Sequence, residues 1–161
     1  MARILEGALD GKRVRVALVV SRFNETITRR LLAGAEECLE RHGCGADART
    51  VVRVPGAWEL PQAARRLVEG GGHDAVVALG ALIRGETAHF DVLATQVAWG
   101  LAELALRGDC VVTFGVLTTD TLAQAMERSG PADGNKGCEA ARSALEMVQL
   151  FRRIAELRVE R

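Results

Sequence analysis

Short apolar runs alternate along this chain with longer segments in which apolar residues return every three or four positions. Runs of the first kind, rich in Val, Ile and Leu and bounded by turn residues, are typical of buried strands. Segments of the second kind are typical of helices that cover a core. The pattern predicts strands at residues 14–20, 50–54, 75–80 and 110–117.

Each predicted strand leads into a predicted helix. The first helix carries apolar residues from Ile27 to Leu39 and ends near Gly43, where glycine favours a helix stop. Pro61 is compatible only with the first turn of the second helix. The remaining helices are predicted from their apolar positions at residues 60–68, 92–104, 120–129 and 145–154.

This order of elements predicts the fold class. Strands that alternate with helices of crossover length form a parallel sheet with helices on both faces. We therefore expect an α/β fold, a three-layer α/β/α sandwich around a central, mainly parallel four-stranded sheet, with residues 1–161 in one domain. Within residues 1–10, the isolated stretch Ile4–Leu9 is expected to add to a sheet edge or to pack on a neighbouring subunit.

Composition and charge exclude several function classes. The 21 Lys and Arg residues balance the 21 Asp and Glu residues, so the whole-protein field offers little attraction for nucleic acid or an anionic membrane. No signal-like apolar region or membrane-length stretch occurs, which predicts a cytoplasmic protein. No CxxC pair or metal-ligand spacing occurs either, so we expect reduced, buried thiols at Cys38, Cys44, Cys110 and Cys138.

Polar and aromatic residues gather where the predicted strands end. The carboxyl ends of parallel strands share one rim, and ligands of such sheets bind outside it. Four segments reach this rim, at residues 21–24, 55–59, 81–89 and 118–120.

Several positions on the rim allow both a functional and a structural interpretation. The Phe23 ring either stacks on a flat heterocycle or packs on its own helix as a staple. Gly85–Thr87 opens the third predicted helix, where free N–H groups suit a phosphate and Thr87 alternatively serves only as a cap. His89 lies in the same first turn, so beside an anion site it is a candidate acid and base.

Two cations lie further along the chain. Arg128 falls at the far end of the predicted helix 120–129, about 15 Å from its start at 1.5 Å per residue. Any substrate that Arg128 binds is therefore expected in the site of a neighbouring subunit. Lys136 lies in Gly134–Gly137, which opens the terminal helix as a turn and lacks the spacing of a Walker loop.

Five strings span nearly the whole chain, namely Arg22–Asn24, Val54–Pro61, Gly80–Asp91, Phe114–Asp120 and Asn135–Gly137. Each string alone is weak, but together, in this order and spacing, they closely resemble the 6,7-dimethyl-8-ribityllumazine synthase family. The resemblance implies condensation of 5-amino-6-(D-ribitylamino)uracil with 3,4-dihydroxy-2-butanone 4-phosphate, releasing phosphate and water. It also implies a place in riboflavin biosynthesis, as a transferase without a metal or organic cofactor.

The resemblance also assigns roles to residues of this sequence. It implies that Phe23 stacks on the pyrimidine and that His89 transfers protons. The ribityl chain and the uracil are assigned to Ala57, Trp58, Glu59, Ala81, Leu82 and Ile83. The ketose phosphate is assigned to Glu86, Thr87 and Arg128, and further site positions are Phe114 and Lys136.

An oligomeric enzyme follows from the same resemblance. The implied site lies between adjacent subunits of a pentamer, with Phe114 and Arg128 supplied by the neighbour. The turn Gly130–Gly134 lacks the short insertion of members that stop at pentamers, which favours an icosahedral shell. A riboflavin synthase is a possible protein partner.

Three other classes of protein deserve comparison. A binding or storage protein for lumazine or flavin would use the same pocket without a proton carrier, and a purely structural shell subunit would not need the rim. Retention of His89, Arg128 and Lys136 together argues against the storage protein, and the intact rim argues against the purely structural subunit. The predicted topology is flavodoxin-like, but Ser21–Asn24 is too bulky for the phosphate loop of a flavodoxin-like electron carrier.

Overall fold

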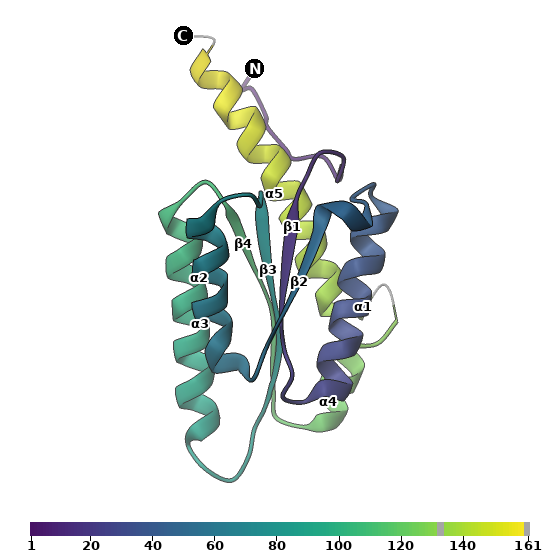
Figure 1. The fold of residues 1–161 in the computed structure, drawn as a ribbon, viewed down its shortest axis with the longest axis vertical. Helices are drawn as coiled ribbons and strands as arrows, with labels where there is room; N and C mark the ends of the chain where they lie inside the picture. Colours follow the sequence, from purple (N-terminus) through teal and green to yellow (C-terminus); the bar gives the residue numbers. More distant parts are fainter. Residues whose placement is uncertain (132–133, 160–161) are drawn as a thin grey trace.

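The four predicted strands form one parallel sheet in the order β2-β1-β3-β4 (Figure 1). The structure is a computed structural model that describes residues 1–131 and 134–159. The strands are β1 (Val16–Ser21), β2 (Arg49–Val54), β3 (Ala75–Ile83) and β4 (Val111–Thr119). The predicted α/β class with a four-stranded parallel sheet is confirmed.

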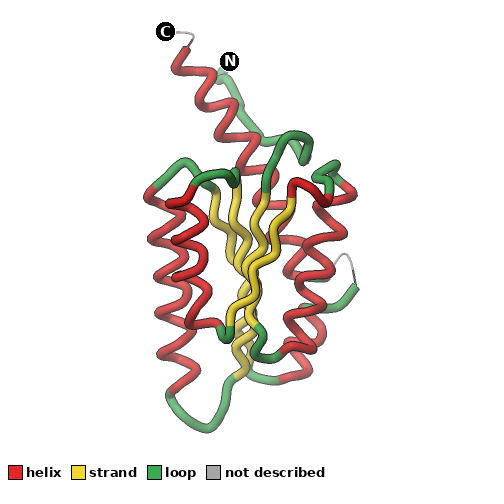
Figure 2. The backbone as a smooth tube through the Cα atoms, viewed as in Figure 1, coloured by secondary structure: helices red, strands yellow, loops and turns green. Residues whose placement is uncertain are grey.

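Helices cover both faces of this sheet and complete the predicted three layers (Figure 2). On one face lie α1 (Glu25–Arg41), α4 (Leu122–Arg128) and the long α5 (Lys136–Val159). On the other lie α2 (Leu60–Gly70) and α3 (His89–Arg107). Two single turns of 3₁₀ helix, η1 (Ala46–Ala48) and η2 (Ala57–Glu59), flank β2. Among the described helices, none is long and apolar enough to cross a membrane.

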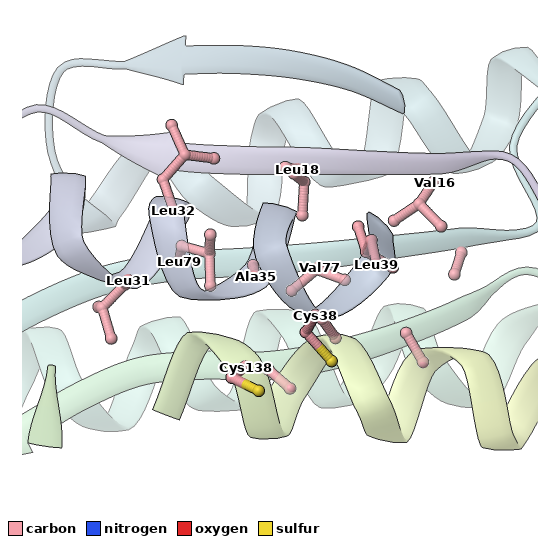
Figure 3. Close-up of a cluster of buried hydrophobic side chains, with 14 of the residues drawn as sticks. Val16, Leu18, Leu31, Leu32, Ala35, Cys38, Leu39, Val77, Leu79 and Cys138 are labelled. Atoms are coloured by element: carbon pink, nitrogen blue, oxygen red, sulfur yellow. The ribbon is translucent and has the colours of Figure 1, made fainter. Parts of the chain in front are cut away.

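The core between the sheet, α1 and α5 is apolar and closely packed. Leu18 and Val77 from the strands meet Leu31 and Leu39 from α1, all fully buried (Figure 3). Burial of each such leucine contributes about 1.5–3 kcal/mol relative to exposure. At Gly137 the backbones approach so closely that a Cβ would lie 2.0 Å from the carbonyl oxygen of Leu31. The α1–α5 contact therefore requires glycine at this position.

The cysteines are free thiols, as predicted, and Cys38, Cys44 and Cys138 are buried. Cys110 is only partly buried. Cys38 and Cys138 lie next to one another where α1 packs on α5 (Figure 3). Burial raises the pKa of the Cys38 thiol to about 12, and the contact with Cys138 adds to the effect. The Cys38 thiol is therefore protonated at neutral pH and acts as a small apolar group.

The N-terminal segment, residues 1–10, is extended and lies beside the outer half of its own α5 (Figure 1). The side chain of Gln149 donates a hydrogen bond of 2.6 Å to the carbonyl of Asp10, and Arg153 donates one of the same length to Glu6. Ile4 nevertheless remains 77% exposed. Packing of this segment on a neighbouring subunit stays a prediction.

Several predicted boundaries are wrong at the carboxyl ends of the strands. β3 continues to Ile83 and β4 to Thr119, because the two strands pair as far as these residues. Residues 81–83 and 118–119 therefore belong to strands rather than loops. The third helix begins at His89 rather than Gly85.

Two further differences concern the region after β4. The helix predicted at 120–129 is shorter, since α4 spans only Leu122–Arg128. The turn Gly130–Gly134, whose length favours a shell, includes Ala132 and Asp133, which lie outside the described residues.

Candidate active site

A cleft of about 770 Å³ opens at the rim where the strands end. Its walls come from the β1–α1 loop, from η2 and from the first turns of α3, and its floor is the end of β3. The cleft brings together most of the predicted site residues, namely Phe23, Ala57, Trp58, Glu59, Ala81, Leu82, Ile83, Thr87 and His89. Residues from three of the four predicted rim segments thus face one cavity, and residues 118–120 do not line it.

The β1–α1 loop presents an aromatic ring to this cleft. The backbone N–H of Phe23 donates to the carbonyl of Pro55 at 3.0 Å, while its side chain stays 70% exposed. A hydrophobic staple would bury the ring against its own helix. The exposure therefore favours the interpretation in which the ring is free to stack on a ligand.

Asn24 is a residue of this loop to which the sequence assigned no role. It adopts the left-handed conformation with φ 58°, and its side-chain amide donates a hydrogen bond of 2.8 Å to the carbonyl of Ala81 on β3. Asparagine is among the few residues that tolerate this conformation, and its place just before a helix was a usable signal. Asn24 fixes the loop that carries Phe23 to the floor of the cleft.

The opposite wall is the turn after β2. A carboxylate oxygen of Glu59 accepts a hydrogen bond of 2.9 Å from the backbone N–H of Gly56, which closes the turn. Trp58 is 52% exposed, whereas Ala57 is buried. The floor itself is apolar, since Ala81 and Leu82 are buried and belong to the part of β3 that pairs with β4. Such a cavity suits a flat ring with a polar edge.

The segment between β3 and α3 is exposed and lies at the mouth of the cleft. Ala88, not Thr87, is the residue that caps α3, although the Thr87 hydroxyl accepts a long contact of 3.4 Å from the His89 N–H. Thr87 and His89 line the cleft, and Glu86 does not. The amino end of α3 therefore points its positive dipole toward the same space as His89.

The remaining predicted residues lie apart from this cleft. Phe114, Arg128 and Lys136 line a second depression of about 460 Å³ between β4, α4 and α5. Phe114 is 46% exposed, and the ammonium of Lys136 pairs with Glu139 at 2.8 Å. Because α4 has seven residues, Arg128 lies about 10 Å from the start of that helix, which is less than predicted. Arg128 nevertheless lies on the other side of the sheet from the cleft.

The cleft is also lined by residues that sequence reasoning did not select, and Phe90 and Leu93 of α3 are the largest of them. Their place in the helical pattern gave no signal, because an apolar side chain that lines a cleft looks like one that packs in a core. No group of three His, Cys, Asp or Glu side chains within the described ranges is placed to hold a metal ion.

The fold and these cavities define a class of protein. It is an α/β protein with a small-molecule cleft at the carboxyl ends of parallel strands and with a separate cationic depression beside the edge strand β4.

Comparison with known proteins narrows this class. The 6,7-dimethyl-8-ribityllumazine synthase family matches residues 13–152. The chain is 51% identical over 148 residues to the 6,7-dimethyl-8-ribityllumazine synthase of Chlorobium phaeobacteroides, covering 92% of this chain and 96% of that protein. It is 47% identical over 150 residues to the synthase of Chlorobaculum tepidum, covering 93% and 97%. The chain belongs to the 6,7-dimethyl-8-ribityllumazine synthase family.

Proposed function

We propose that this protein is a transferase of riboflavin biosynthesis that forms 6,7-dimethyl-8-ribityllumazine. Its substrates are 5-amino-6-(D-ribitylamino)uracil and 3,4-dihydroxy-2-butanone 4-phosphate, and it releases phosphate and water. The observation that carries the proposal is the gathering of the family's motif residues around one cleft. The names of the relatives agree with it.

The pyrimidine occupies the apolar part of the cleft. Its ring stacks on Phe23, whose face is open, and lies over the floor formed by Ala81, Leu82 and Ile83. The ribityl chain runs along η2, where Ala57, Trp58 and Glu59 line the cavity. A flat ring and a polyhydroxyl tail match the two kinds of wall.

The ketose phosphate occupies the mouth of the cleft beside Glu86 and Thr87. Backbone N–H groups and the amino end of α3 favour an anion there. The cationic partners Arg128 and Lys136, together with Phe114, come from a neighbouring copy of the chain. This arrangement accounts for the position of these three residues in a depression separate from their own cleft.

The chemistry needs orientation and proton transfer. The 5-amino group attacks the ketone, and loss of a first water gives an imine. Elimination of phosphate leaves an enol that tautomerises to a carbonyl. The ribitylamino nitrogen attacks this carbonyl, and loss of a second water completes the ring. Holding two substrates that react readily can supply most of the acceleration. His89 moves protons between these steps, and Arg128 stabilises the charge of the departing phosphate.

The protein acts as a homo-oligomer. Val92, Trp99 and Leu106 are 60%, 63% and 88% exposed and recur every seven residues along α3. Apolar side chains at this spacing form a stripe that another helix can cover. The described part of β4 pairs with β3 on one side only, which leaves an edge for a neighbour to protect.

The finer details of assembly rest on the family resemblance. They are a pentamer, the assembly of pentamers into an icosahedral shell, a contact with riboflavin synthase and a cytoplasmic location. Sedimentation velocity separates the first two, because a shell of many pentamers sediments far faster than one pentamer.

A direct assay tests the proposed activity. Purified protein is mixed with both substrates, and lumazine absorbance is followed against the spontaneous rate at the same concentrations and pH. Saturable acceleration supports the proposal, and Arg41→Ala, which removes an exposed arginine at the far end of α1, is a control expected to match the wild type. Binding of lumazine or flavin without acceleration would instead indicate a storage protein.

A further inference from the structure

Arg84 is the centre of a polar network at the rim of the cleft. Its Nε donates a hydrogen bond of 2.9 Å to Asp120, and its Nη1 donates one of 3.0 Å to Asp91. The guanidinium also lies over the ring of Phe90, 4.4 Å from the ring centre. Its backbone N–H donates to the carbonyl of Thr119 at 2.9 Å. One residue thus joins the ends of β3 and β4 to the first turn of α3.

This combination of contacts depends on arginine. The planar guanidinium can address two carboxylates at fixed angles while its face stacks on an aromatic ring, which an ammonium group cannot do. A single exposed ion pair contributes little to stability, but a network with fixed geometry restricts the segments that it joins. The hydrogen bonds to Asp91 and, with a smaller effect, to Asp120 raise the pKa of Arg84 above its ordinary value, so the guanidinium stays charged across the pH range of an activity assay.

The hydrogen bonds from Arg84 to Asp91 and to Asp120 are the two arms of this network, and each arm leads to a different part of the proposed site. Asp91 follows His89 by two residues in the first turn of α3, and Phe90 is itself a wall of the cleft. Asp120 immediately precedes the cap of α4, and its backbone N–H donates a hydrogen bond of 2.9 Å to the side-chain oxygen of Gln124. The helix that begins there ends at Arg128.

We propose that Arg84 is a positioning residue that holds His89 in its own cleft through Asp91 and orients Arg128 for the neighbouring cleft through Asp120. This inference rests on the proposed function. Arg84 touches no substrate in this scheme. It fixes the short segment 85–88 between two rigid anchors, so that the proton carrier and the phosphate-binding arginine keep their geometry.

The two arms predict different kinetic defects, which a purely structural role would not produce. Asp91→Asn weakens the arm toward His89 and should lower kcat with little change in KM for the ketose phosphate. Asp120→Asn weakens the arm toward Arg128 and should raise that KM with little change in kcat. Arg84→Ala should combine both defects, each about tenfold or more, because small misplacements of catalytic groups cost up to about 100-fold in rate.

The test measures kcat and KM for both substrates in these three variants, in Arg84→Lys and in the control Arg41→Ala. Arg84→Lys keeps the positive charge but lacks the planar guanidinium that addresses both carboxylates, so it should restore less than half of the activity that Arg84→Ala loses. Equal kinetics of Asp91→Asn and Asp120→Asn, or full rescue by lysine, would overturn the inference. If Arg84→Ala does not fold, the two aspartate variants carry the test alone.

Failure of the inference can be told apart from failure of the proposed function. Wild-type protein that does not exceed the spontaneous rate refutes the function itself. Wild-type acceleration that all the variants retain in full refutes only the role of Arg84.

Discussion

Mixing two impaired variants tests whether the catalytic site is shared between copies of the chain. His89 lines the cleft, whereas Arg128 lines the separate depression beside β4. If each site combines the cleft of one copy with the depression of the next, His89→Ala and Arg128→Ala damage opposite halves. A mixed oligomer then contains some sites in which both halves are intact.

The expected recovery follows from the geometry of a ring. In a one-to-one random mixture, a site is intact when its cleft comes from an Arg128→Ala chain and its depression from a His89→Ala chain. Head-to-tail contacts make these choices independent, so about one quarter of the sites regain full activity. With the ketose phosphate well below its KM, each variant alone should retain at most about a tenth of the activity. His89→Ala loses general acid–base catalysis, typically about 100-fold or more, and Arg128→Ala raises KM about tenfold or more.

Co-expression of the two variants with different affinity tags gives the mixed oligomer, and lumazine absorbance gives its turnover. The matched control is the His89→Ala, Arg128→Ala double variant mixed with wild type. Shared sites then leave about one quarter of the activity, whereas sites within one chain leave about one half. Activity of the mixed single variants no higher than that of each variant alone would refute the shared site.

Three further predictions concern separate parts of the molecule. Arg128→Ala should raise KM for the ketose phosphate about tenfold or more, through loss of charge-assisted hydrogen bonds, while KM for the uracil stays constant in steady-state assays; a selective loss of uracil binding would contradict this role. Gly137→Ala places a Cβ 2.0 Å from the Leu31 carbonyl and should cost about 3 kcal/mol of unfolding free energy in a denaturant titration, whereas Gly45→Ala, with no atom within 4 Å, should be nearly neutral. Because the pKa of Cys38 rises from 9.0 to about 12 on folding, the folded thiol keeps a proton that the unfolded thiol loses, so the free energy of unfolding should fall as the pH rises from about 9 towards 12. In thermal melts over this pH range, Cys38→Ala should lose stability less steeply than the wild type, and an equal dependence of stability on pH would count against this cause.

The pattern of residues along the chain was enough to predict the fold class and most residues of the cleft. Alternating strands and helices require a parallel sheet between two helical layers, and that topology brings the ends of the strands to one rim. Phe23, Trp58 and His89 could therefore be placed together without coordinates. Chain order carries this information because each residue lies within a few positions of a strand end.

Features that depend on contacts between distant residues could not be predicted from the sequence and emerge only in the folded chain. The extension of β3 to Ile83 follows from its hydrogen bonds with β4, which local propensity cannot show. The hydrogen bond from Asn24 to Ala81 and that from the Arg84 guanidinium to Asp120 join segments far apart in sequence. The separation of Arg128 from the cleft likewise follows from the side of the sheet on which α4 packs, and that side is set by the core beneath it.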